Sequence, residues 1–207
     1  MTQNHPQYFY KDAKHTQSDS YLLPVFNDIL ENGSGLKVLD LGCGNGGFCN
    51  FLCEKGYDVT GVDISESGIE MARKTYPHLK FVRSDICDLE DFREIEKGAF
   101  DVIVAMEVIE HLQYPRKLMK VVKKYLKQGG VFLVSTPYHG YIKNLVISLA
   151  GKWDKHFSVD WDVGHLRFFS VESLKRLVSS EGFSVVRFKF AGRLPLLWKS
   201  MICISNK

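Results

Sequence analysis

The feature that most constrains this chain is a glycine-rich stretch that follows a short apolar run near residue 40. Val38 to Leu41 reads as a buried strand, and Gly42, Gly44 and Gly46 alternate directly after it, before a run with helical spacing. Glycines in this alternation let the backbone turn tightly, and a ligand can approach their N–H groups because no Cβ is in the way. The stretch therefore predicts a strand, a ligand-binding turn and a helix.

The residues of this turn leave the ligand open. Gly42, Gly44 and Gly47 satisfy the dinucleotide-binding pattern, in which a pyrophosphate lies at the N-terminus of the helix. Asp40 argues against a pyrophosphate, because a carboxylate two residues before the first glycine suits a ligand with positive groups. S-adenosylmethionine (SAM) carries an ammonium and a sulfonium, so it fits this charge better than NAD. A plain structural corner that binds nothing is the third alternative.

Acidic residues end two further apolar segments. Residues 57–63 form a second expected strand that ends at Asp63, 21 positions after Gly42, close to the spacing at which an acid binds the hydroxyl pair of a ribose. A role for Asp63 beside the N-terminus of the next helix is the alternative, and we expect Ser65 to cap that helix. Residues 81–86 form the third expected strand, which carries Asp85 near its end.

The remaining pattern alternates strands with helices. Strands are expected at 100–106 and 131–135, and helices at 48–55, 117–126 (ending at Gly129-Gly130) and 170–180. Such alternation implies right-handed crossovers and one sheet with both faces covered by helices. Two closing strands are expected at 183–191 and 199–205.

Length and composition favour one soluble domain. The 207 residues suffice for a single α/β domain over 1–207, with an N-terminal helical segment at 1–35 and an inserted lid at 138–169. The net charge of +3 is too small to indicate a nucleic-acid partner. Five cysteines form no CxxC pair, and neither a secretory signal nor a membrane-spanning run is evident. We therefore expect a cytoplasmic protein.

From Asp40 to Gly46 the sequence resembles the first motif of the class I SAM-dependent methyltransferases, which has the form D-x-G-x-G-x-G. The resemblance implies a Rossmann-like α/β fold, with seven mostly parallel strands, a closing antiparallel hairpin and helices on both faces. In that family an Asp at the position of Asp85 accepts a hydrogen bond from the adenine amino group, and Ile86 would pack on the ring. The cofactor-binding residues expected here are Asp40, Gly42, Cys43, Gly44, Gly46, Asp63, Ile64, Asp85, Ile86 and Met106.

A second group of functional residues follows the fourth expected strand. On a helical turn Glu107, Glu110 and His111 stand at i, i+3 and i+4, so their side chains would share one face. That face would open at the carboxyl edge of the sheet, where open α/β folds bind their ligands. Two carboxylates and an imidazole can hold a divalent metal, for which the donor types favour Mg²⁺ or Mn²⁺.

The E-x-x-E-H string resembles two branches of the family, the ubiquinone-biosynthesis O-methyltransferases and the small-RNA 2′-O-methyltransferases. Both branches are metal-assisted at this motif, and in the RNA branch a further histidine after the fifth strand completes the site. His165 is the natural counterpart here, and His139 and His156 are substitutes for it.

Three interpretations of this group remain open. A metal held by Glu107, Glu110, His111 and His165 would lower the pKa of an acceptor hydroxyl and fix it in line with the methyl group. Alternatively His111 acts alone as a general base, since its ordinary pKa of about 6.5 suits that task. In the third interpretation Glu110 is solvated and His111 only packs. Glu110 and His111 are the expected catalytic residues in the first two.

The sequence as a whole predicts a SAM-dependent methyltransferase that acts on a small-molecule acceptor, through oxygen. A SAM-binding subunit without catalysis, an RNA 2′-O-methyltransferase and an NAD-dependent oxidoreductase are the alternatives. The segment 142–161 combines an apolar helix, two tryptophans and flanking lysines. It suits a lid over an apolar acceptor, a peripheral contact with a membrane surface, or simple packing on its own domain.

Overall fold

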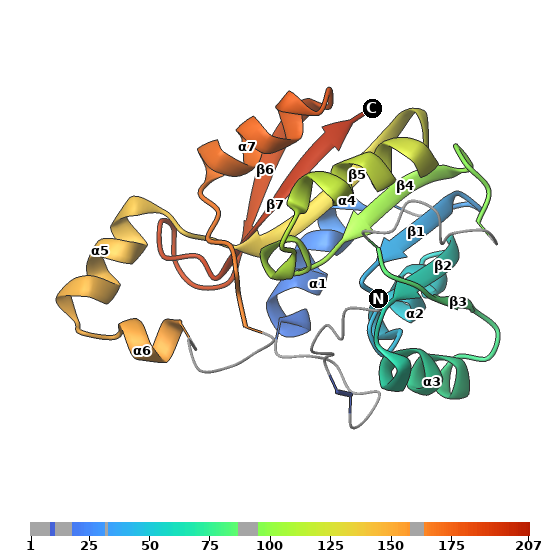
Figure 1. Ribbon diagram of the computed structural model, residues 1–207, viewed down its shortest axis with the longest axis horizontal. Helices are drawn as coiled ribbons and strands as arrows, with labels where there is room; N and C mark the ends of the chain where they lie inside the picture. The colour runs from blue at the N-terminus through green and yellow to red at the C-terminus, as the bar shows by residue number, and fades with distance from the viewer. Residues whose placement is uncertain (1–8, 11–17, 32, 87–94, 158–163) are drawn as a thin grey trace.

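The computed structural model of the chain describes residues 9–10, 18–31, 33–86, 95–157 and 164–207, and these build a seven-stranded sheet (Figure 1). The strand order is β3-β2-β1-β4-β5-β7-β6. The pairs from β3 to β5 are parallel, whereas β7 runs antiparallel to both β5 and β6, which confirms the expected fold and its closing hairpin. The strands are β1 (Lys37–Leu41), β2 (Asp58–Asp63), β3 (Lys80–Arg83), β4 (Phe100–Ala105), β5 (Leu126–Pro137), β6 (Ser184–Ala191) and β7 (Ser200–Asn206).

The helices divide between the two faces of the sheet. The helices packed on one face are α1 (Asp19–Ile29), α2 (Gly47–Glu54) and α3 (Glu66–Thr75), and those on the other are α4 (Pro115–Tyr125) and α7 (Val171–Ser180). Successive residues of a strand point to opposite faces of the sheet, so their side chains belong to the hydrophobic cores on the two faces in turn. On β4, for example, Val102 and Val104 join the core of α1 to α3, whereas Ile103 joins the core of α4 and α7.

The order of the strands creates a crevice between β1 and β4. From β1 the chain proceeds outward through β2 to β3, and it then returns to lay β4 on the opposite side of β1. The loops that leave β1 and β4 therefore diverge at the carboxyl edge, which is where open α/β sheets bind ligands. The loop after β1 carries the glycine-rich turn, and the loop after β4 carries a short 3-10 helix, η1 (Ile109–His111).

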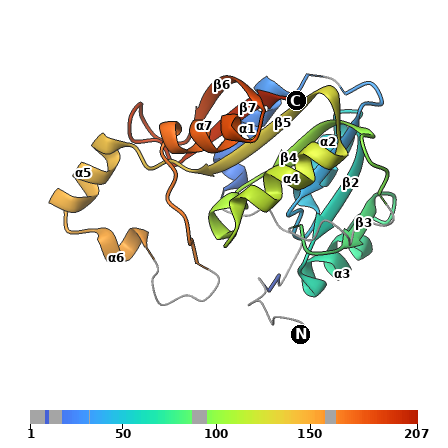
Figure 2. The same ribbon diagram turned by 45° about the horizontal axis from the view of Figure 1, so that its top comes forward.

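Two further helices stand away from the sheet. Helices α5 (Tyr141–Leu149) and α6 (Trp153–His156) follow β5 and project from the body of the molecule, as both ribbon views show (Figures 1 and 2). They belong to the segment expected as a lid, of which residues 158–163, with Trp161, lie outside the described residues, as do 1–8, 11–17 and 32 of the N-terminal segment. No helix in the described part of the chain is both long and apolar enough to span a bilayer.

Two strands differ from their expected bounds. Strand β3 ends at Arg83, so Asp85 lies in the loop beyond the strand rather than at its last residue. Strand β5 begins at Leu126, and Gly129-Gly130 therefore lies inside the strand instead of ending the preceding helix. The pairing of β4 with β5 shifts between Phe100 and Val102, and Gly129 has a φ of 76° that lets the chain bend there.

Candidate active site

A cavity of about 1210 Å³ lies at the carboxyl edge of the sheet and joins both groups of residues expected to be functional. Gly46 is the one expected residue that does not line it. Those that do are Asp40, Gly42, Cys43, Gly44, Asp63, Ile64, Asp85, Ile86, Met106, Glu107, Glu110, His111 and His165.

The glycine-rich turn takes its shape from left-handed backbone conformations. Gly42, Gly44 and Gly46 have φ angles of 86°, 53° and 81°, a region that side chains rarely tolerate. A Cβ on Gly44 would lie 2.3 Å from the hydroxyl of Tyr10, which lines the cavity above the turn. The turn therefore presents bare backbone to the cavity, and a tyrosine from the N-terminal segment approaches it.

Asp63 connects this turn to the next helix. Its Oδ2 accepts a hydrogen bond from Gly44 N at 2.8 Å, and its Oδ1 accepts one from Ser65 N at 2.7 Å. Burial raises the pKa of Asp63, and these backbone N–H groups partly offset that rise. The Ser65 side chain in turn accepts from Gly68 N, which confirms it as the N-cap of α3. Ile64 is a further backbone donor to this carboxylate, and since a carboxylate can accept about four hydrogen bonds, it still has capacity for a ligand.

Asp40 is a buried carboxylate that forms no ion pair with a described residue. Its Oδ2 accepts a hydrogen bond from the Cys49 thiol at 3.2 Å. Burial, together with the nearby carboxylates Asp63 and Asp19, raises its pKa to about 7, although the Cys49 hydrogen bond acts in the opposite direction. A positively charged ligand in the cavity would stabilise the charged form of Asp40 and so lower its pKa. A ligand with positive groups is what the sequence predicted for Asp40.

Glu107 differs from the expectation. Its φ is 54°, so it is not on a helical turn, and the prediction that it shares a face with Glu110 and His111 is wrong. Its backbone N–H donates to Ser135 Oγ at 3.0 Å, while Ser135 and Ser200 donate to its two carboxylate oxygens at 2.8 and 2.9 Å. Contacts from β5 and β7 thus hold Glu107 in a conformation that local sequence does not favour.

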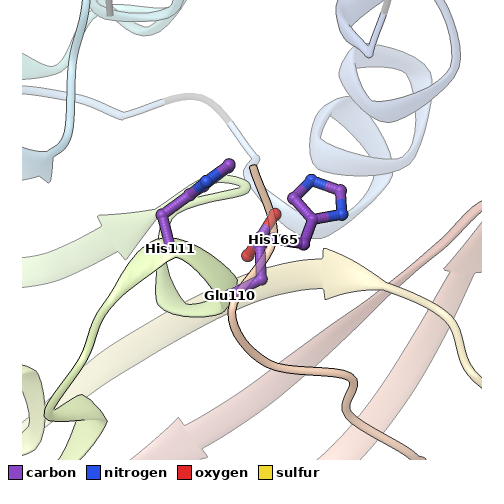
Figure 3. Close-up of side chains that lie close together, drawn as sticks. All are labelled: Glu110, His111 and His165. Atoms are coloured by element: carbon purple, nitrogen blue, oxygen red, sulfur yellow. The ribbon is translucent and has the colours of Figure 1, made fainter. Parts of the chain in front are cut away.

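Glu110 and His111 lie on η1, and His165 comes to them from a distant segment (Figure 3). Leu166 and Arg167 donate backbone N–H bonds to the Glu110 carbonyl at 2.8 and 3.0 Å. His111 Nδ1 lies 3.2 Å from the Gly164 carbonyl. Because a carbonyl only accepts, His111 Nδ1 carries the proton in this contact, and Nε2 is the unprotonated nitrogen of the ring.

These three side chains could hold a metal ion. One ligand atom from each of Glu110, His111 and His165 lies within 4.8 Å of the others. The Glu110 side chain is fully buried, and neither of its carboxylate oxygens has a hydrogen-bond partner among the described residues. Burial, followed by the Glu107 charge, raises the pKa of Glu110, and burial beside His111 lowers that of His165 to about 4.

His139 and His156, the expected substitutes for His165, line the cavity but do not join the group formed by Glu110, His111 and His165. The sequence did not indicate several other residues of the cavity wall. Among the lining residues that no motif indicated are Tyr21, Lys143, Arg193, Lys199 and Ser200. They come from the N-terminal segment, α5 and the β6–β7 hairpin, and only the folded chain brings them to the cavity.

The known proteins that this chain resembles include methyltransferases. Residues 13–187 match the model of a family described as a methyltransferase domain. A ubiquinone biosynthesis O-methyltransferase from Thiobacillus denitrificans is 35% identical over 104 residues, which cover 50% of this chain and 45% of that protein. The protein of that name from Caulobacter vibrioides is 31% identical over 156 residues, which cover 71% and 59%. The chain thus spans about half the length of the relatives it matches.

Solved structures share the fold. A protein from Pyrococcus horikoshii is 23% identical with a TM-score of 0.72, and the match covers 95% of this chain and 94% of that one. A SAM-dependent methyltransferase from Mesorhizobium loti is 20% identical with a TM-score of 0.66, and the match covers 89% and 96%.

We expect Asp40→Asn to stabilise the protein without ligand, increasingly so as the pH rises. Its carboxyl has an ordinary pKa of 3.8 when unfolded and about 7 when folded. Between these values the folded state holds a proton that the unfolded state has lost, so the free energy of unfolding falls as pH rises. Asparagine removes this loss of stability, and the gain in the free energy of unfolding should approach roughly 4 kcal/mol above pH 7.

Urea unfolding of wild type and variant at pH 5 and pH 8 measures this difference. Asp58→Asn is the matched control, because Asp58 is exposed at the start of β2 and the change in charge is the same. A gain for Asp40→Asn that is equal at both pH values would contradict the assignment.

Proposed function

The chain belongs to the methyltransferase-domain family, as its glycine-rich motif predicted, and we propose that it transfers a methyl group from SAM to a hydroxyl oxygen of a small molecule. One observation carries this proposal: a single cavity joins the acidic glycine-rich turn to the group formed by Glu110, His111 and His165. A methyl donor and an acceptor bound at these two places would share one enclosed space.

The residues at the turn fit SAM. When bound, SAM supplies a methyl group that its sulfonium makes electrophilic. Asp40 is a desolvated carboxylate that a cationic ligand would stabilise, and Asp63 has the lone pairs to accept from a ribose. The absence of a Cβ on Gly44 leaves room for Tyr10 against the turn, and both residues line the cavity where the cofactor would bind. Asp85 and Ile86 would contact the adenine, as the family resemblance implies.

At the acceptor end, we assign the proton transfer to His111. Its Nδ1 donates to the Gly164 carbonyl, so Nε2 is the unprotonated nitrogen of this tautomer. The acceptor hydroxyl gives its proton to this nitrogen as its oxygen bonds to the methyl carbon and the carbon–sulfur bond breaks. S-adenosylhomocysteine and the methyl ether are the products.

A divalent cation held by Glu110, His111 and His165 is the alternative that we propose at this end, and in that case His111 Nε2 would bind the ion instead of taking the proton. The unpaired oxygens of Glu110 support it, since a buried carboxylate without a donor is unfavourable unless a cation binds it. When bound, the ion would lower the pKa of the acceptor hydroxyl. One carboxylate and two imidazoles suit Mn²⁺ better than Mg²⁺, and Glu107 stands outside this group because Ser135 and Ser200 engage its oxygens.

A small acceptor is favoured over RNA. Relatives named ubiquinone biosynthesis O-methyltransferase match a large part of the chain, and the name specifies oxygen as the atom methylated in those proteins. The net charge of +3 gives little general attraction for a polyanion. The RNA 2′-O-methyltransferase and the SAM-binding subunit without catalysis remain the rival functions.

We also propose that α5 and α6 contact a membrane surface. Apolar side chains are exposed along α5, among them Tyr141 at 78% and Leu149 at 81%. The exposed Lys152 and Lys155 flank Trp153 at the start of α6. Apolar side chains bordered by cations suit the interface of an anionic bilayer.

Replacing Asp63 should weaken SAM binding. Charge-assisted hydrogen bonds of roughly 1.5–3 kcal/mol each are lost in Asp63→Ala, so the dissociation constant should rise more than about tenfold. Calorimetric titration measures it, with Glu66→Ala as a control on the exposed first turn of α3. An unchanged constant would remove Asp63 from the cofactor site.

Glu110→Ala separates metal assistance from simple base catalysis. If a metal is held, the variant should lose turnover and Mn²⁺ binding, detected by electron paramagnetic resonance, but keep SAM affinity. Chelation of wild type should mimic it, and Glu172→Ala, on the exposed start of α7, should change nothing. Full turnover in chelator would instead leave His111 as the base, with activity falling as the pH drops through the histidine pKa.

Co-sedimentation with anionic phosphatidylglycerol vesicles at low salt tests the membrane contact. Wild type should pellet with the vesicles, and Leu149→Glu should remain largely in the supernatant. Val186→Glu is the matched control, because Val186 is 56% exposed on the edge strand β6. Equal pelleting of both variants, or none by wild type, argues against this surface.

A further inference from the structure

Charged residues line the cavity from both halves of the sheet, among them Asp19, Glu107, Glu110, Lys117, Arg167 and Lys199. Asp40, Asp63 and Asp85 come from β1, β2 and the loop after β3, which form one half of the sheet. Lys143 and Arg193 line the cavity from α5 and from the turn between β6 and β7, beyond the opposite half. Both ribbon views show α5 beside that turn (Figures 1 and 2). The cavity thus has an acidic end at the glycine-rich turn and a basic end at α5.

Lys143 is a buried ammonium group with only neutral hydrogen-bond partners. It is 7% exposed, and its Nζ donates to the Tyr138 carbonyl at 2.7 Å and to the Lys199 carbonyl at 3.5 Å. Among the described residues no carboxylate pairs with it. Glu107 attracts it from a distance, but serine hydroxyls occupy both oxygens of that carboxylate. A buried charge in this state is stabilised by any anion that reaches it.

Arg193 adds a second cation at the same end. Its backbone has a φ of 60°, directly after Gly192 at 71°, in the left-handed region that is uncommon for residues with side chains. The two cations repel each other, and this repulsion, after burial, lowers the pKa of Lys143 to about 8. A guanidinium offers paired N–H donors that match a carboxylate or a phosphate.

We propose that the methyl acceptor carries an anionic group, a carboxylate or a phosphate, which Lys143 and Arg193 bind while the acceptor hydroxyl reaches His111. This inference rests on the proposed methyl transfer and specifies the class of its acceptor. The basic end then selects hydroxy compounds that carry an anionic group over neutral ones of the same shape. A neutral ligand would leave both cations without a counter-ion.

Matched probes test this selectivity. 3-Hydroxybenzoate, 3-hydroxyphenyl phosphate and the neutral 3-hydroxybenzamide are titrated by calorimetry into protein saturated with S-adenosylhomocysteine. At least one anion should bind wild type more than about tenfold tighter than the amide. The tighter of the two anions identifies the group that the site prefers.

Three variants locate the effect. Lys143→Met and Arg193→Gln should each reduce the preference for the anion to a few-fold or less, and Arg193 lies on an exposed turn where the substitution leaves the core intact. Lys152→Gln is the matched control, because Lys152 is exposed on the same segment but does not line the cavity. It should keep the full preference. Affinity for S-adenosylhomocysteine should be unchanged in all three.

The outcomes separate this inference from the proposed function. Intact binding of S-adenosylhomocysteine by wild type without any preference for the anions overturns the inference alone. A loss of S-adenosylhomocysteine affinity in Lys143→Met or Arg193→Gln also overturns it, because Lys143 and Arg193 would then bind the carboxylate of the cofactor. Failure of wild type to bind S-adenosylhomocysteine contradicts the proposed function, and the inference falls with it.

Discussion

The parallel pairing of β1 with β2 and β4 is the constraint on which the rest of the structure depends. Parallel strands bring their carboxyl ends to one edge, so residues far apart in the chain, such as Asp40, Asp63 and Met106, end there together. The chain leaves β1 and β4 in opposite directions, and the loops that follow them diverge. The cavity is a consequence of this topology, and the glycine-rich turn and η1 are placed on its two sides.

Several charges in this cavity are buried without compensation inside the protein. Asp40 has only a thiol donor, Glu110 has no donor in the described structure, and Lys143 has only carbonyl partners. Each such group lowers the free energy of unfolding of the empty protein. Their signs differ from place to place, and this pattern matches a cationic cofactor at one end, a metal ion in the middle and an anionic acceptor at the other. The free energy of unfolding is therefore lowered at the places where bound ligands are expected to raise it again.

The second half of the site depends on backbone hydrogen bonds between segments that no sequence motif connects. The Glu110 carbonyl accepts from Leu166 and Arg167, and the His111 ring meets the Gly164 carbonyl. These contacts bring His165 to Glu110 and fix the tautomer of His111 at the same time. The segment after the lid therefore determines how the side chains of Glu110, His111 and His165 lie relative to one another.

The sequence by itself determined the local elements and the acidic glycine-rich turn. Apolar runs, Gly42 to Gly46 and the Ser65 cap are set by neighbouring residues, so they could be read from spacing, and alternation of strands and helices fixed the sheet. Only the tertiary structure decided the conformation of Glu107, because Ser135 and Ser200 from β5 and β7 hold it at positive φ. It also decided the choice of His165 and the basic end at Lys143 and Arg193. Those depend on contacts between segments far apart in the chain, which local periodicity does not encode.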